Sequence, residues 1–270
     1  MAPSTPHVLL IGGHGKVAQL MTPLLLARSW AVTSLIREQA QVPTIEKLGH
    51  GQPGKLNVLV RSVEDVRTER DAKSILDEVK PSWVVWSAGA GGRGGAPRTY
   101  AIDRDAAKAF IRASTNTPSI TTFLMISWLG SRRVKPSWWN DADWAGVQHT
   151  FASVLPTYAD AKLAADEYLV AAAAARGDGF RAINLRPGTL SDVPSSGKAE
   201  LGRTSKFNGK ASRELVAQTA AELLGSGYKG GWLDLLDGEV PVKEAVEQVT
   251  REGVDVIEGE DVERILKTEV

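Results

Sequence analysis

The sequence predicts an α/β fold in which a parallel β-sheet is covered by helices on both faces. Short apolar runs alternate with amphipathic helical stretches along most of the 270 residues, which is the pattern of repeated strand–helix–strand units. The apolar runs are not interrupted by alternating polar residues, as expected for parallel strands buried between two helical layers. We therefore expect one doubly wound domain over residues 1–270 with a small C-terminal lobe on the substrate side.

The individual elements follow from these apolar runs. Strands are expected at 8–11, 30–36, 57–60, 82–89, 121–127, 181–188 and 232–238, and helices after the first strand and at 68–79, 99–113, 158–175 and 212–224. The segment 128–156 has no clear period and is rich in Trp, Pro and Asp, so we expect a long connection there. The substrate side of the domain is expected to be formed by residues at about 128–157 and 189–230.

Composition excludes several classes of function. The 32 basic residues balance the 32 acidic residues without a long run of either sign, which argues against nucleic acid as a partner. Cysteine is absent and the four histidines are scattered, so no metal site is expected. The N-terminus does not resemble a leader, and no apolar stretch is long enough to span a membrane. We expect a cytoplasmic protein with a small-molecule substrate, and a homodimer is left open.

A glycine-rich turn follows the first expected strand directly. Its glycines have the spacing GxxGxxA, in which Gly12 allows a tight turn, Gly15 allows close approach of a pyrophosphate, and Ala18 lets the helix lie close to the strand. The positive helix end and its free N–H groups favour an anion above the turn. The alternative is a turn that binds nothing. The candidate cofactor-binding residues here are Gly12, Gly13, His14, Gly15, Lys16 and Val17.

The end of the second expected strand indicates which dinucleotide is used. NAD-binding proteins of this kind usually place an acid there for the adenosine ribose, whereas this chain has Ile36 and Arg37. Arg37 therefore favours a 2′-phosphate and predicts that NADP(H) is preferred over NAD(H). The alternative is a solvated arginine beside Glu38.

A second candidate site lies in the segment YADAKLAADEYL. Tyr158 and Lys162 are four residues apart and would share one face of a helix. The strand that precedes this region ends at Ser127, at the sheet edge where doubly wound folds bind ligands. A phenol with a pKa near 10 is a poor acid–base group at neutral pH, and a neighbouring ammonium group favours its ionised form.

These motifs together resemble the short-chain dehydrogenase/reductase superfamily, particularly its atypical and extended members. The segments GGHGKVA, WSAG, MIS, YADAK and LRPGTL match in order over residues 8–190. The resemblance implies a Rossmann-type fold and further residues close to the cofactor. These are Ser62 and Val63 near the adenine, Ser87, Ala88 and Gly89 after the fourth strand, and Pro187, Gly188, Thr189 and Leu190 at the nicotinamide.

The resemblance also implies catalytic roles. Tyr158 would give or take the proton, Lys162 would lower its pKa and hold the nicotinamide ribose, and Ser127 would orient the carbonyl. An NADP(H)-dependent oxidoreductase, a carbonyl reductase or alcohol dehydrogenase, is therefore expected. The chain departs from the family pattern at AGAGGRGG after the fourth strand and at Trp128. A non-catalytic NADP(H) sensor and an epimerase remain alternatives.

Tryptophans are concentrated in the segment after Ser127. Four of the eight lie there, and Trp128, Trp138 and Trp139 are candidates for the wall of a site for a small apolar or aromatic substrate. The alternative is that these rings pack the segment onto the rest of the domain.

Overall fold

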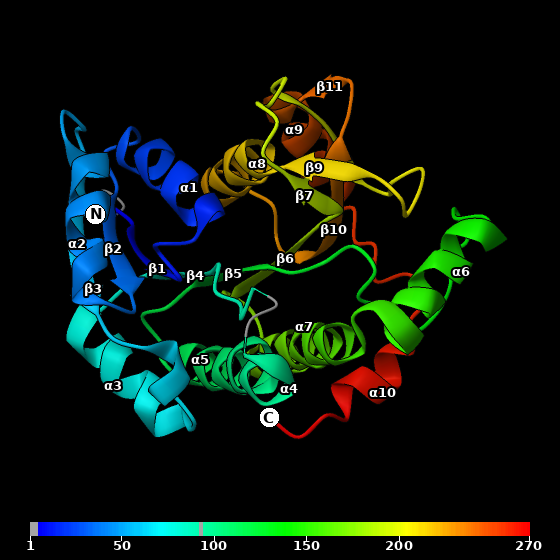
Figure 1. The fold of residues 1–270 in the computed structure, drawn as a ribbon, viewed down its shortest axis with the longest axis horizontal. Coiled ribbons are helices and arrows are strands. Elements are labelled where there is room, and N and C mark those ends of the chain that lie inside the picture. The colour runs from blue at the N-terminus through cyan, green and yellow to red at the C-terminus, as the bar shows by residue number, and fades with distance from the viewer. Residues whose placement is uncertain (1–4, 92–93) are drawn as a thin grey trace.

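The computed structural model describes residues 5–91 and 94–270 (Figure 1). Its strands are β1 His7–Ile11, β2 Ala31–Ile36, β3 Lys55–Val60, β4 Trp83–Trp86, β5 Thr122–Ile126, β6 Arg181–Pro187, β7 Thr189–Ser191, β8 Lys198–Gly202, β9 Lys210–Ser212, β10 Gly231–Asp237 and β11 Val240–Pro241. Its helices are α1 Lys16–Leu26, α2 Val42–Glu46, α3 Glu69–Val79, α4 Gly95–Thr99, α5 Ala107–Thr115, α6 Asp141–His149, α7 Pro156–Arg176, α8 Arg213–Gly225, α9 Val242–Glu252 and α10 Val262–Leu266.

The central sheet has the order β11-β8-β10-β6-β5-β4-β1-β2-β3. The seven strands from β3 to β10 in this order pair in parallel, and β8 pairs antiparallel to β10. The strand order 3-2-1-4-5-6 is that of a Rossmann fold, with the change of direction between β1 and β4. The predicted α/β fold class is therefore confirmed.

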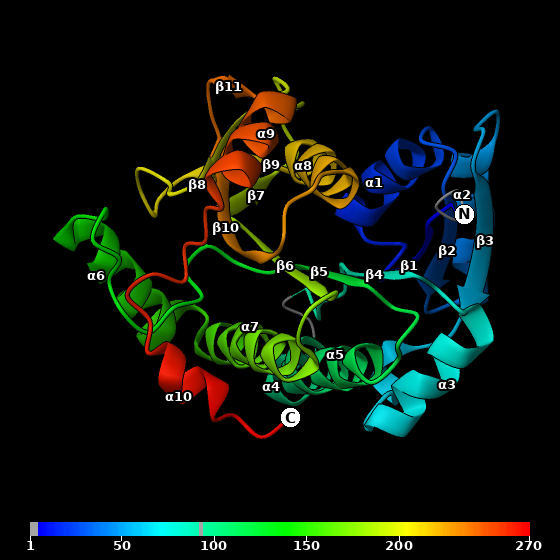
Figure 2. The same cartoon turned by 180° about the vertical axis from the view of Figure 1, so that it is seen from behind.

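Helices cover both faces of this sheet, as the two opposite views show (Figures 1 and 2). Apolar side chains of α1, α8 and α9 pack on one face, and those of α3, α5 and α7 pack on the other. Both faces of the inner strands are buried, and every residue of β5 is buried. This explains why the strands read as continuous apolar runs.

Two elements differ from those expected. The connection 128–156 contains α6, which Asn140 caps by accepting a hydrogen bond from the backbone N–H of Asp143. Because α6 buries only Asp143 and Val147, it leaves little apolar periodicity in the sequence. The helix expected at 99–113 is interrupted by a π-helical segment, Tyr100–Ala106, between α4 and α5.

The C-terminal part of the chain extends the sheet and adds a small lobe. Strands β7 and β9 form a separate two-stranded parallel sheet, and β8 and β11 continue the edge beyond β10. A small apolar cluster joins the segment after β5 to this lobe through Leu129, Trp139, Val147 and Leu236. Among residues 5–91 and 94–270, no helix combines the length and apolar character needed to cross a bilayer.

Candidate cofactor and active site

The glycine turn between β1 and α1 is packed too closely for side chains. Gly12 has φ +81°, and a Cβ there would lie 2.7 Å from the backbone of Ala88. A Cβ on Gly13 would lie 1.8 Å from the hydroxyl oxygen of Ser34. Gly15 has an extended backbone and donates its N–H to the Gly12 carbonyl at 2.8 Å. The turn therefore needs glycine at 12 and 13 for packing alone, whether or not a phosphate binds above it.

The start of α1 is suited to an anion. No side chain among the described residues caps it, and its first turn holds Lys16 and no acid. In contrast, α3 begins with a Thr68–Asp71 capping box and a further acid, Glu69. Because the first N–H groups of a helix need acceptors, α1 has an unmet requirement that a phosphate would satisfy.

A pocket of about 690 Å³ lies over this turn. The described residues that line it include nine of the candidate cofactor-binding residues: Gly12, His14, Gly15, Lys16, Arg37, Val63, Ser87, Ala88 and Gly89. The described lining also includes five cationic side chains, Lys16, Arg37, Arg61, Arg98 and Arg213, and one acid, Glu64. The pocket therefore has the charge and the backbone shape for a ligand with several phosphates.

The other candidate cofactor residues lie outside this lining. Gly13 and Val17 are packed into the turn and helix, and Ser62 uses its hydroxyl to accept a hydrogen bond from the Glu64 N–H at 3.2 Å. Residues 187–190 lie at the end of β6 and in β7, where the Gly188 N–H donates to the Leu235 carbonyl. Tyr158 and Lys162 are also outside the lining.

An ion-pair bridge connects the glycine turn to the C-terminal lobe. Asp192, directly after β7, contacts Lys16 at 2.7 Å through one carboxylate oxygen and Arg213 at 2.8 Å through the other. Both cations line the pocket, and Asp192 forms an ion pair with each of them. The bridge brings the segment following residues 187–190 next to the turn.

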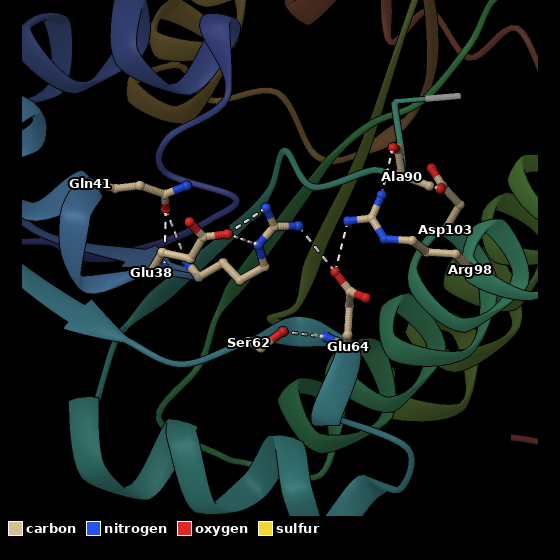
Figure 3. A network of polar contacts seen from close by, with 8 residues as sticks. Glu38, Gln41, Ser62, Glu64, Ala90, Arg98 and Asp103 are labelled. Atoms are coloured by element: carbon tan, nitrogen blue, oxygen red, sulfur yellow. Dashed lines mark hydrogen bonds and ion pairs between the residues drawn. The ribbon is translucent and has the colours of Figure 1, made fainter. Parts of the chain in front are cut away.

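The pocket lining also contains a network of polar contacts around Glu64 (Figure 3). Arg37 contacts Glu38 at 2.6 Å and Glu64 at 3.2 Å, and Arg98 donates to Glu64 at 2.7 Å. Arg98 also donates to the Ala90 carbonyl at 3.0 Å. Arg37 thus lies in the pocket as expected, and it also has the Glu38 contact of the alternative interpretation.

Tyr158 and Lys162 lie together on α7. The Lys162 ammonium is 5.7 Å from the centre of the Tyr158 ring. It also lies 3.3 Å from a carboxylate oxygen of buried Asp103, and it donates to the Ile126 carbonyl at 3.4 Å. The second carboxylate oxygen of Asp103 accepts from the Ala90 N–H at 2.9 Å. Asp103 therefore connects the tyrosine–lysine pair to the loop that lines the pocket.

The charges around Tyr158 act in opposite directions. Burial raises the pKa of the Tyr158 phenol, Lys162 lowers it, and Asp103 and Asp166 raise it further, so the net pKa is above the ordinary value. Burial lowers the pKa of Lys162, but Asp103, Tyr158 and Asp166 outweigh this effect and raise it. The expected lowering by Lys162 is present but is not dominant. Tyr158 is therefore a protonated phenol at neutral pH.

Ser127 lies next to these residues but is already hydrogen-bonded. Its hydroxyl donates to buried Asp166 at 2.8 Å. Burial raises the pKa of Asp166, whereas Arg186 and the hydrogen bond from Ser127 lower it, and the net direction is upward. Asp166 is four residues after Lys162 on α7 and was missed, although this spacing places it on the same side of the helix.

The three candidate substrate tryptophans have different surroundings. Trp128 lies beside Tyr158, with 6.1 Å between ring centres, and also contacts Phe151 and Phe207. Trp139 is buried and donates its indole N–H to the Thr204 carbonyl. Trp138 packs near the guanidinium groups of Arg132 and Arg203. The packing alternative therefore fits Trp138 and Trp139, whereas Trp128 has a place next to the candidate catalytic tyrosine.

Comparison with known proteins gives the family. A family described as NAD(P)H-binding matches residues 12–226, which include the glycine turn, the Glu64 network and the Tyr158–Lys162 pair. The chain belongs to this NAD(P)H-binding family. The pocket at the glycine turn is therefore the place where the nucleotide is expected, and the uncapped α1 and the crowded glycines fit such a ligand.

Individual relatives agree with this family. The chain is 33% identical over 242 residues to UPF0659 protein C216.03 of Schizosaccharomyces pombe, covering 88% of this chain and 92% of that protein. It is 27% identical to the uncharacterized sugar epimerase YhfK of Bacillus subtilis, covering 90% and 99%. A solved structure of a putative NAD-dependent epimerase/dehydratase from Bacillus halodurans is 25% identical, with a TM-score of 0.71 and coverage of 90% and 99%.

Proposed function

We propose that this NAD(P)H-binding protein is an NADP(H)-dependent oxidoreductase that reduces the carbonyl group of a small apolar or aromatic substrate. The observation that carries this proposal is the Tyr158–Lys162 pair. The Lys162 ammonium lies 5.7 Å from the centre of the Tyr158 ring and 3.3 Å from a carboxylate oxygen of buried Asp103. Asp103 is also bonded to the Ala90 N–H in the loop that lines the nucleotide pocket.

The side chains have separable roles in this reaction. The dinucleotide, when bound, supplies the hydride. Tyr158 holds the proton that the carbonyl oxygen needs, because its raised pKa keeps the phenol protonated at neutral pH. Lys162 carries a positive charge that stabilises the phenolate left after proton transfer. Ser127, whose single hydroxyl proton is donated to Asp166, would turn this proton to the carbonyl oxygen to orient the substrate.

The preference for NADP(H) and the class of substrate rest on neighbouring residues. Arg37 lines the pocket at the end of β2 and supplies a guanidinium group for a 2′-phosphate. Trp128 lies 6.1 Å from the Tyr158 ring and offers an apolar aromatic face to a substrate bound there. We therefore favour ketones with aromatic or aliphatic groups as substrates.

Replacement of Tyr158 tests the reaction directly. With NADPH and a panel of aromatic and aliphatic ketones, Tyr158→Phe should lower kcat/KM by about 10²–10⁴-fold, because the ring stays and the transferable proton is lost. Its NADPH affinity, measured by calorimetry, should stay near that of the wild type. Lys162→Ala should weaken NADPH binding as well as catalysis. Tyr100→Phe is the matched control, since Tyr100 lies in the π-helical segment outside the pair.

Two other outcomes would redirect the proposal. A wild-type protein that binds NADPH and reduces no ketone would instead be an NADP(H)-responsive binding protein. Epimerase activity is the second candidate, because a relative matched over 90% of this chain is named a sugar epimerase. Inversion of one carbon centre of a sugar substrate, followed by NMR and without net consumption of the dinucleotide, would identify that activity.

A further inference from the structure

The carboxylate of Glu64 contacts Arg37, the residue proposed above to bind a 2′-phosphate. One oxygen of Glu64 contacts two guanidinium groups, Arg37 at 3.2 Å and Arg98 at 2.7 Å (Figure 3). Hydrogen bonds from Arg98, and then from Arg37, lower the pKa of Glu64, so it is an anion at neutral pH. All three side chains line the pocket.

Glu64 and its two arginine partners come from three different parts of the fold. Glu64 lies in the turn Val63–Asp65 after β3, whereas Arg37 follows β2 and Arg98 lies on α4. The Arg98 guanidinium is itself held to the Ala90 carbonyl at 3.0 Å. Arg98, which is itself held by the Ala90 carbonyl, therefore fixes the Glu64 carboxylate in contact with Arg37.

A 2′-phosphate and a 2′-hydroxyl would interact with Glu64 in opposite ways. The phosphate would compete with Glu64 for Arg37 and be repelled by its charge. A hydroxyl would donate a hydrogen bond to the same carboxylate. Glu64 is the one acid among the described residues of the lining, so this opposition is concentrated in a single side chain.

We propose that Glu64 determines cofactor specificity by opposing the 2′-phosphate that Arg37 attracts, so that it holds the preference for NADPH over NADH below the value that the arginines alone would set. This proposal rests on the nucleotide site of the proposed function. It assigns the discrimination to the balance between one carboxylate and two arginines, and not to Arg37 alone.

Glu38 provides a matched control for this proposal. It also pairs with Arg37, through a hydrogen bond from the guanidinium Nε at 2.8 Å, but it is not part of the described pocket lining. Glu38→Gln and Glu64→Gln thus remove the same charge from partners of the same arginine. Only Glu64→Gln removes it from within the pocket.

The test measures dissociation constants of NADPH and NADH by calorimetry for the wild type and both variants. Glu64→Gln should raise the NADPH preference by about three- to tenfold, with tighter NADPH and weaker NADH binding. Glu38→Gln should change the preference less than Glu64→Gln does, because Glu38 competes for Arg37 but lies outside the described lining, away from the 2′-phosphate or 2′-hydroxyl itself. The fragments 2′,5′-ADP and AMP should show the same pattern, which ties the effect to the 2′-phosphate. Equal melting temperatures would show that the variants are folded.

The failure of this inference differs from failure of the proposed function. An unchanged preference in Glu64→Gln, or an equal change in Glu38→Gln, would overturn the role of Glu64 while NADPH binding and ketone reduction remain. A wild-type protein that binds neither dinucleotide would overturn the proposed function itself.

Discussion

At the scale of single residues, Asp103 controls the electrostatics of the candidate active site. It is buried, lies 3.3 Å from the Lys162 ammonium, and accepts a hydrogen bond from the pocket loop at Ala90. Its charge favours protonated Lys162 and disfavours ionised Tyr158. The same carboxylate thus favours the charged form of Lys162 and the neutral form of Tyr158.

The Asp103→Asn variant should reveal this effect in a pH profile. With Lys162 still protonated, removing the negative charge of Asp103 lowers the pKa of Tyr158, because Asp103 is one of the groups that raise it. Reduction requires the protonated phenol. The decrease of ketone-reduction activity at alkaline pH should therefore begin at a lower pH in the variant than in the wild type. The measurement is kcat/KM for ketone reduction between about pH 7 and 11. Asp105→Asn, which removes a carboxylate paired with Arg104, is the control. A profile that stays in place, or moves upward, would contradict this role.

At the scale of elements, an ionic cluster of one carboxylate and two guanidinium groups connects α10 to α7. Glu167 on α7 is buried and contacts Arg264 on α10 and Arg133 in the segment after β5. Burial raises the pKa of Glu167, but hydrogen bonds from Arg133 and Arg264 outweigh it and lower the pKa below the ordinary value. One carboxylate therefore joins three parts of the chain that are distant in sequence.

Glu167→Gln should lower the free energy of unfolding by about 1–2 kcal/mol at pH 7, since both arginines are half-exposed and stay hydrated. A carboxyl with a lowered folded pKa stabilises the protein above its ordinary pKa of 4.5, and this contribution is lost as the pH falls through the folded value. The difference in melting temperature between wild type and variant should therefore shrink toward pH 3.5. A difference that stays constant with pH would exclude ionisation of Glu167 as the cause.

At the scale of the whole molecule, charges are buried under α7 where β6 and β10 meet. Arg186 and Asp234 are fully buried, and the Arg186 Nε lies 3.1 Å from an Asp234 oxygen. Arg186 also stacks over Trp232, with 4.2 Å between the guanidinium carbon and the ring centre. Burial raises the pKa of Asp234, and Arg186 opposes this. Stability here depends on both charges being kept or both being removed.

A double-mutant cycle tests this dependence. Asp234→Leu alone should lower the free energy of unfolding by about 3–5 kcal/mol, because it leaves Arg186 buried without its partner. The double variant Arg186→Met with Asp234→Leu should lose less than the sum of the two single variants, in urea unfolding at pH 7. Losses that simply add would mean that the pair is not coupled.

Features with a local sequence signal could be predicted from the sequence, and contacts between residues distant in the chain could not. The parallel sheet and the glycine turn were predictable because periodicity and glycine spacing are local signals. Helix α6 was missed because it buries few residues, and Glu64 and Arg98 were missed because their contact joins residues 34 apart. Asp166 had a local signal in its spacing from Lys162, but Asp103 did not, since it lies in a π-helical segment that departs from helical periodicity.

The π-helical segment Tyr100–Ala106 also constrains how this stretch of chain can change in length. A π-helical hydrogen bond encloses one residue more than an α-helical one, so the loss of one residue would leave an ordinary helix with its two ends still in place. Residues inside the segment would shift by one position, about 100° around the helix axis, while the flanking turns keep their orientation. The Asp103 side chain would then point away from Lys162, and the ammonium would lose its contact with this carboxylate. Relatives shorter by one residue here are therefore expected to supply that negative charge from another position.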